Sequence, residues 1–182
     1  EILAGGQIKA RVWPMSTGQA LNLGTVAFGT WHHVALVYNR ATLTLTGYLD
    51  GVATASLGSI DRAAPFESSF GVHYAIGAAD STNMGSGAFF DGQVADFRVW
   101  SVARSAGQIV TWKNRPLVGN DAGLVLNWQL DNITGSIAPD SSIRNQVGTL
   151  AGGIGPTGLQ SRVYGPIHVG VQDTPGDPIW LE

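Results

Sequence analysis

Residues 31–57 alternate between apolar and polar side chains more regularly than any other part of the chain. Between Leu43 and Leu49, leucines alternate with threonine and tyrosine, which is the period of a strand with one apolar face. Asp50-Gly51 follows at once, and this pair accepts the positive φ angles that a tight hairpin turn needs. The stretch therefore predicts antiparallel strands joined by short turns.

The composition fits one globular domain with few charges. The chain has 182 residues, of which 44% are hydrophobic and 13% are charged, against about 25% charged residues in an average soluble domain. The solvated surface must therefore be built mainly from uncharged polar residues, which suits a secreted adhesive or sugar-binding module. A net charge of -3 gives no electrostatic reason to bind nucleic acid or anionic lipid.

Cysteine is absent, so disulfides and thiolate metal sites are excluded. A disulfide-free secreted domain of this size is more typical of bacteria than of animals. The sequence has no apolar run of about 18 residues, so we expect no membrane insertion. Because the chain starts at Glu1 without methionine, we interpret it as a piece of a larger extracellular protein with neighbouring domains. Leu181-Glu182 is interpreted as a cloning scar.

Short strand-like runs separated by turn residues continue on both sides of the hairpin, which is typical of an all-β sandwich. A short helical turn is expected near residues 105–112, because Ser105 and Gln108 have the spacing of a capping box. Residues 151–180 are rich in glycine and proline, and could form an edge strand, a tail or a linker. We therefore assign residues 1–150 to the sandwich. Five side chains are predicted to close its core: Leu43, Leu45, Leu49, Phe97 and Val99.

Three segments carry a family resemblance. They are Trp31-His32-His33-Val34-Ala35 with the hairpin after it, Phe89 to Trp100 with Ala103-Arg104-Ser105, and Gly119 to Trp128 with Asp140-Ser141-Ser142. In their order and spacing the chain resembles the laminin-G-like, concanavalin A-like jelly-roll domains. The resemblance implies an antiparallel jelly-roll β-sandwich. The family has two or three further strands before the point where this chain begins. Their counterpart could be the third segment, in a circularly shifted order, or they could be absent, or another segment could supply them. An open sandwich would leave an unpaired edge, so we expect the C-terminal segment to complete the sheets.

The resemblance also admits enzymes, because laminarinase-like glycosidases of this fold carry Glu-x-Asp-x-x-Glu on one strand. Glutamate occurs here only at positions 1, 67 and 182, and Asp91 and Asp96 have a spacing that sends strand side chains to opposite faces. We therefore predict that the chain is not an enzyme, although it could be an accessory domain of one.

His32 and His33 are neighbours in a predicted strand, where adjacent side chains point to opposite faces. They therefore cannot chelate one metal ion together. We expect one of them to be buried and hydrogen-bonded, and the other to be exposed.

Calcium is the most plausible cofactor, since it prefers carboxylate, amide and carbonyl oxygens from loops. Related jelly rolls hold a calcium ion partly through an aspartate at the start of the last core strand, and the resemblance gives that place to Asp96. The alternative for Asp96 is an ion pair with Arg98. Asp140 is a second candidate, with an Asx-turn cap as its alternative. Asp80 and Asn83, in a Gly/Ser-rich stretch, are a third.

Six tryptophans could offer flat rings to sugars. Trp31, Trp100 and Trp128 lie in strong strand patterns and are expected in the core. Trp13 and Trp112 are less embedded and are the candidate ligand contacts.

These observations predict a non-catalytic extracellular module that binds a glycan or glycoprotein, with calcium as a possible aid. The alternative is a protein–protein interaction or spacer domain of an adhesin, toxin or multidomain enzyme.

Overall fold

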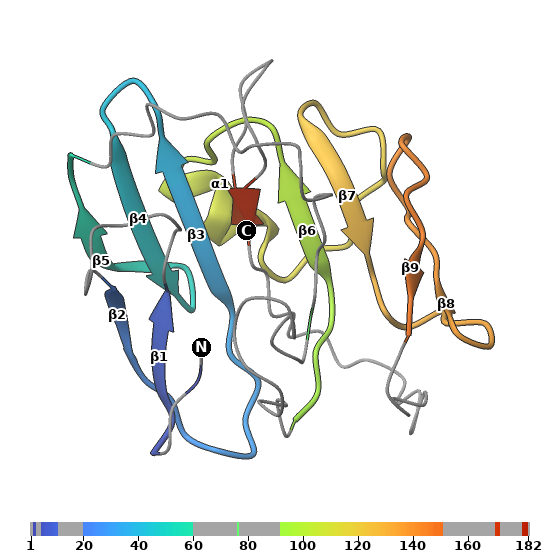
Figure 1. Cartoon of the computed structure of the whole chain (residues 1–182), viewed down its shortest axis with the longest axis horizontal. Helices are drawn as coiled ribbons and strands as arrows, with labels where there is room; N and C mark the ends of the chain where they lie inside the picture. Colours follow the sequence, from blue (N-terminus) through green and yellow to red (C-terminus); the bar gives the residue numbers. More distant parts are fainter. Residues whose placement is uncertain are drawn as a thin grey trace, which may run out of the picture.

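The computed structural model describes residues 2, 5–10, 20–59, 76 and 92–150, together with the backbone of residues 170–171 and 180–181. Within these residues the chain forms antiparallel sheets and one short helix, so the all-β prediction is confirmed (Figure 1). The elements are β1 (Gln7–Ala10), β2 (Leu21–Thr25), β3 (Val34–Asn39), β4 (Thr44–Leu49), β5 (Val52–Leu57), β6 (Phe97–Trp100), α1 (Ala106–Trp112), β7 (Leu124–Trp128), β8 (Ile137–Ala138), β9 (Gly148–Thr149), β10 (Gly170–Val171) and β11 (Trp180–Leu181).

The predicted hairpin is the three-stranded sheet β3-β4-β5. Its second turn is as expected, because Asp50 and Gly51 have φ angles of 54° and 86° and connect the paired residues Leu49 and Val52. The first turn differs from the prediction. Leu43 has a φ of 51° and closes the four-residue turn between β3 and β4, so it lies outside the strand and only partly buried.

The sheet buries both of its faces, although the alternation predicted one apolar face. On one face, Tyr38 and Leu45 pack with β1 and β2, and Leu49 lies partly buried against them. On the other face, Ala35 and Tyr48 pack against the helix. The consecutive apolar residues of β3 indicate burial of both faces, since a strand covered on both sides does not alternate apolar with polar residues.

The hairpin of β1 and β2 lies close to the sheet at Gly47. A Cβ atom on Gly47 would come within 2.9 Å of the Leu23 side chain, closer than packed carbon atoms approach one another. Leu23 is fully buried. Glycine at this position therefore lets the two layers meet.

Helix α1 begins as predicted. The Ser105 hydroxyl accepts a hydrogen bond from the Gln108 backbone N–H, and the Gln108 side chain accepts one from the Ser105 N–H. After the last turn, the guanidinium of Arg98 donates to the carbonyls of Trp112 and Arg115, at 3.0 and 2.7 Å. A buried cation from β6 thus satisfies carbonyls at the carboxyl end of the helix.

Phe97 and Val99 on β6 are buried in a cluster with Leu126 of β7, as predicted for the core. The strand is shorter at its start than its apolar pattern indicates, because Asp96 has a φ of 52° and leaves the extended conformation. β10 and β11 pair with each other and lie against β3 and β6 (Figure 1). The boundary at residue 150 and the circularly shifted strand order stay predictions.

No helix in the described part of the chain is long and apolar enough to cross a membrane.

Candidate functional site

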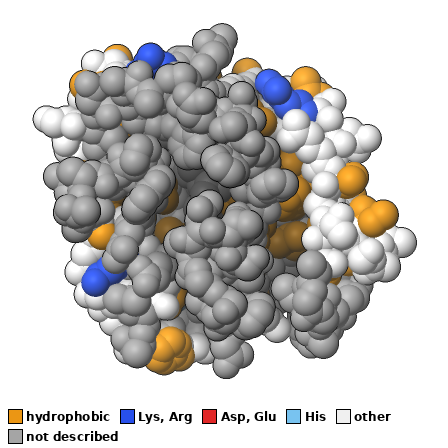
Figure 2. All heavy atoms as spheres, viewed as in Figure 1, with side chains coloured by type: hydrophobic (Ala, Val, Ile, Leu, Met, Phe, Trp, Pro, Cys, Tyr) orange, Lys and Arg blue, Asp and Glu red, His pale blue; other side chains and the backbone are white. Residues whose placement is uncertain are grey.

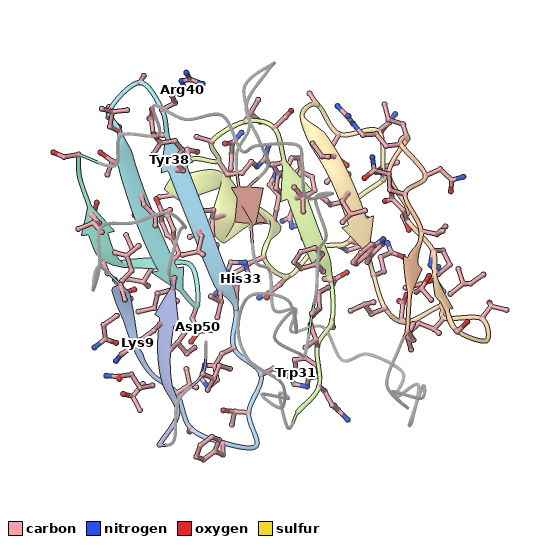
Figure 3. All side chains as sticks on the ribbon, viewed as in Figure 1. Lys9, Trp31, His33, Tyr38, Arg40 and Asp50 are labelled. Carbon is pink, nitrogen blue, oxygen red and sulfur yellow. The ribbon has the colours of Figure 1, made fainter. Side chains whose placement is uncertain are left out.

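The loop between β2 and β3 displays two aromatic side chains to solvent. Phe28 is 74% exposed and Trp31 is 45% exposed. We call residues 27–32 the aromatic loop. Gly29 lies between the two rings with a φ of 77°, a conformation that glycine adopts without strain. Figure 3 shows Trp31 at the side of the molecule where the chain enters β3. The prediction that Trp31 lies in the core is therefore wrong.

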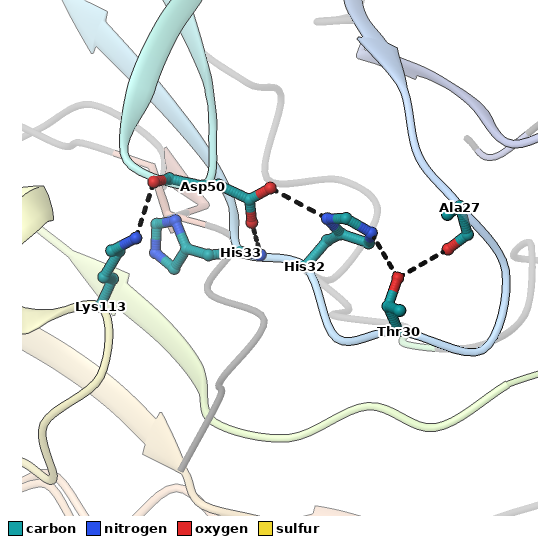
Figure 4. Close-up of polar contacts among 6 residues, drawn as sticks. All are labelled: Ala27, Thr30, His32, His33, Asp50 and Lys113. Atoms are coloured by element: carbon teal, nitrogen blue, oxygen red, sulfur yellow. Dashed lines mark hydrogen bonds and ion pairs between the residues drawn. The ribbon is translucent and has the colours of Figure 1, made fainter.

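A chain of hydrogen bonds braces this loop from within (Figure 4). The Thr30 hydroxyl contacts the Ala27 carbonyl at 2.9 Å and Nε2 of His32 at 2.8 Å. Nδ1 of His32 then contacts a carboxylate oxygen of Asp50 at 2.9 Å. The loop is thus tied to the β4–β5 turn.

Asp50 also forms hydrogen bonds with His33, directly before the first residue of β3. Its other carboxylate oxygen accepts the His33 backbone N–H at 2.9 Å, and its own N–H donates to the His33 carbonyl. The Asp50 carbonyl accepts a hydrogen bond from the Lys113 ammonium at 2.7 Å. Burial, the largest single influence, acts to raise the pKa of Asp50, but the His32 and His33 hydrogen bonds with the charges of His32 and Lys113 together lower it. The carboxylate is therefore ionised at neutral pH.

The two histidines divide as the strand period predicts. His33 is buried, whereas His32 is partly exposed and joins the loop. Burial, with the nearby charges of Lys113 and Arg98, lowers the pKa of His33 to about 3. The His33 ring is therefore neutral and part of the interior.

Thr30, His32 and Asp50 have the order of a nucleophile, a base and an orienting acid. Two features argue against that chemistry. The Thr30 hydroxyl also lies within hydrogen-bond distance of the Ala27 carbonyl, and the three side chains sit at the surface, where water screens the charges that catalysis would use. The arrangement is better suited to holding a loop in one shape.

Asp140 follows β8 and accepts a second set of hydrogen bonds, which joins the β8–β9 connection to β7. One carboxylate oxygen accepts the backbone N–H groups of Asn127 and Ser142, at 2.9 and 2.8 Å. The other accepts the Ser142 hydroxyl at 2.7 Å and the Gln146 N–H at 2.8 Å. The bond to Ser142 N–H is that of the Asx-turn cap proposed as the alternative for this residue. Calcium at Asp140 stays a prediction, and these four bonds argue against it because they engage both oxygens.

Asp96 is buried at the start of β6, and its carboxylate lies 3.9 Å from the Arg98 guanidinium. The alternative ion pair is thus present. A neighbouring cation disfavours a calcium ion at the same carboxylate. Within the described residues, no three histidine, aspartate or glutamate side chains gather as metal ligands would. Asp80 and Asn83 lie outside the described residues, so the calcium site as a whole stays a prediction.

The other tryptophans are placed as follows. Trp100 is buried and Trp128 is partly buried against Phe97, so both belong to the core as predicted. Trp112, a candidate ligand contact, is partly buried against the cluster around Trp100. Trp13 lies outside the described residues.

Sequence reasoning missed the aromatic loop because it counted Trp31 in the regular pattern of residues 31–57 and expected its ring in the core. A signal was present, since Gly29-Thr30 interrupts the two apolar patterns with turn residues.

Exposed aliphatic side chains gather in a second region, near β8 and β9. Val118 is 83% exposed and Ile143 is 78% exposed, and the Ile143 N–H donates to the carbonyl of Gly119, beside Val118. Figure 2 shows hydrophobic surface on this side of the molecule. We call Val118 and Ile143 the aliphatic pair.

Comparison with known proteins supports the fold and the family. The Laminin_G_3 family model, described as the concanavalin A-like lectin/glucanases superfamily, matches residues 1–110. The chain belongs to this superfamily. The match includes the aromatic loop and the whole β3-β4-β5 sheet. No curated protein and no solved structure matches the chain.

Membership supports a carbohydrate- or protein-binding module, which is the typical role of laminin-G-like domains, while some members of the superfamily are glycosidases. Laminin-G-like domains are also commonly extracellular.

Proposed function

We propose that this domain binds a glycan, free or carried on a protein, and that the aromatic loop is its contact surface. The observation that carries the proposal is the exposure of Phe28 and Trp31 on a loop whose backbone is already braced. A flat ring packs well against the apolar face of a pyranose. A loop held in shape before binding loses less conformational entropy when the ligand arrives.

The surroundings of the loop suit hydroxyl-rich ligands. Asp50 is partly exposed next to the loop, and carboxylate oxygens accept hydrogen bonds from hydroxyl groups. The few charges on the chain also favour an uncharged polar surface over one that attracts ions. We propose that the domain lies outside the cell, because laminin-G-like domains are commonly extracellular and because the composition has few charges.

The test is a glycan array, read with the wild type and with Phe28→Ala and Trp31→Ala. We expect each substitution to weaken binding about tenfold or more, because truncated aromatic anchors are commonly hot spots. Ile143→Ala is the matched control, since it removes an exposed apolar side chain away from the loop and should leave binding unchanged. Melting curves should be alike for all variants.

An array on which the folded wild type binds nothing would overturn the glycan proposal. Protein binding is then the second candidate, and the aliphatic pair is the observation that favours it, because exposed apolar surface commonly marks protein interfaces.

A further inference from the structure

The hydrogen bonds that brace the aromatic loop need a definite number of protons from the groups that form them. Three contacts join four groups in series: the Ala27 carbonyl, the Thr30 hydroxyl, the His32 ring and the Asp50 carboxylate. The two ends of the series can only accept. Three protons are therefore needed, and the hydroxyl brings one of them.

A neutral imidazole brings only one more proton. The ionised Asp50 takes it, because Nδ1 must donate to the carboxylate, which leaves Nε2 with a bare lone pair facing the hydroxyl. The single Thr30 proton can then go to His32 or to Ala27, and the other contact places two lone pairs face to face. One of the three contacts is lost.

A protonated imidazole completes the series. Nδ1–H donates to Asp50, Nε2–H donates to the Thr30 oxygen, and the Thr30 hydroxyl donates to the Ala27 carbonyl. The observed geometry is thus the one that an imidazolium satisfies in full. The Ala27–Thr30 contact closes the turn that contains Phe28 and Gly29, so the proton on His32 bears directly on the aromatic loop.

We propose that protonation of His32 fixes the aromatic loop in its displayed conformation, so that glycan binding is stronger at a pH where the His32 ring carries both protons than where it carries one. The binding part of this inference rests on the proposed function, whereas the coupling of proton and loop does not. One hydrogen bond gained corresponds to about three- to tenfold tighter binding.

The charged groups around His32 come from two further elements. Asp50, on the β4–β5 turn, contacts the His32 ring through its carboxylate at 2.9 Å. Lys113, after α1, donates to the Asp50 carbonyl at 2.7 Å. His33 stays neutral on the buried side, because burial lowers its pKa to about 3.

Nuclear magnetic resonance on the free protein tests the coupling without a ligand. The His32 ring nitrogens and the backbone amides of residues 27–31 are followed from about pH 8 to about pH 5. We expect the amides to move with the same midpoint as the ring. In Thr30→Val the ring should still titrate, while the amides no longer follow it, because the connecting hydroxyl is gone.

His32→Gln is the second variant, since its side chain does not titrate and should leave the amides of the loop insensitive to pH. Thr30 and His32 both lie at or near the surface, so melting curves should stay close to that of the wild type. Ring titration without movement of the amides, or unchanged coupled movement in Thr30→Val, would overturn the inference.

Reading the glycan array at about pH 5 and about pH 8 separates the two proposals. Stronger signals at the lower pH, lost in His32→Gln, support both. If the His32 ring and the loop amides shift together but the array shows no binding, the proposed function fails while the coupling of proton and loop stands. Binding that is equal at both pH values means that the function stands and the pH dependence fails.

Discussion

Asp50 and Asp140 both use a carboxylate to organise backbone N–H groups, but their surroundings differ. Asp140 is buried and accepts four protein hydrogen bonds within one short stretch of chain and its neighbour strand. Asp50 is partly exposed, and it connects the β4–β5 turn to β3 and to the aromatic loop. The pair shows how the degree of burial separates a structural carboxylate from one that can also respond to solvent and ligands.

The comparison concerns one carboxylate that the sequence marked as a candidate calcium ligand, Asp140, and one that it marked only as a turn residue, Asp50. A buried carboxylate that accepts four hydrogen bonds inside the protein, as Asp140 does, has little capacity left for an ion or a sugar. A carboxylate at the surface with one protein contact on each oxygen, as in Asp50, keeps acceptor capacity for a ligand.

The largest effect is expected for Asp140→Ala. The substitution removes the acceptor of the buried N–H groups of Asn127 and Ser142 and of the part-buried N–H of Gln146, so we expect the free energy of unfolding to fall by about 3–5 kcal/mol. Urea unfolding measures it. A loss below about 1 kcal/mol would show that water replaces these bonds and that the contrast with Asp50 is unfounded.

The second effect is a loss of stability in acid caused by His33. Its pKa is about 3 in the folded protein, against an ordinary value of 6.5. Between these two pH values only the unfolded chain binds the proton. The free energy of unfolding therefore keeps its full His33 contribution above pH 6.5 and falls as the pH drops below it, by up to about 1.4 kcal/mol per pH unit. Asp50, whose pKa is lowered, adds a loss in the same direction below its ordinary value of 3.8.

Urea unfolding at several pH values measures this dependence, and His33→Phe is the control. The variant should show a flatter dependence whatever its stability at neutral pH. An equal slope in both proteins would assign the acid sensitivity to other groups.

The smallest effect is expected for Asp50→Asn, which keeps the shape of the side chain and removes its charge. Because the side chain is partly exposed, we expect a loss of about 1 kcal/mol in unfolding free energy. The aromatic loop should loosen, which hydrogen exchange at the amides of residues 27–31 would detect. A loss as large as that of Asp140→Ala would remove the distinction between the two carboxylates.

Features set by neighbouring residues could be predicted from the sequence. The Asp50-Gly51 turn and the Ser105–Gln108 capping box depend on local backbone preferences, and both are present. The division between His32 and His33 follows from the two-residue period of a strand.

Features set by distant residues could not be predicted in the same way. Leu43 carries a strand-like pattern but lies in the turn, because the pairing of β3 with β4 requires a positive φ there. Trp31 is a residue type that is usually buried, yet its exposure depends on where the loop leaves the sheet. The link from His32 to Asp50 joins residues 18 positions apart, so spacing alone did not predict it.

The contact between Leu23 and Gly47 decides how the domain tolerates change. A single added methyl group at position 47 would lie 2.9 Å from the Leu23 side chain, so Leu23 or one of the two packed layers would have to move. We therefore expect the exposed aromatic loop to accept substitutions with a smaller loss of stability than Gly47 does.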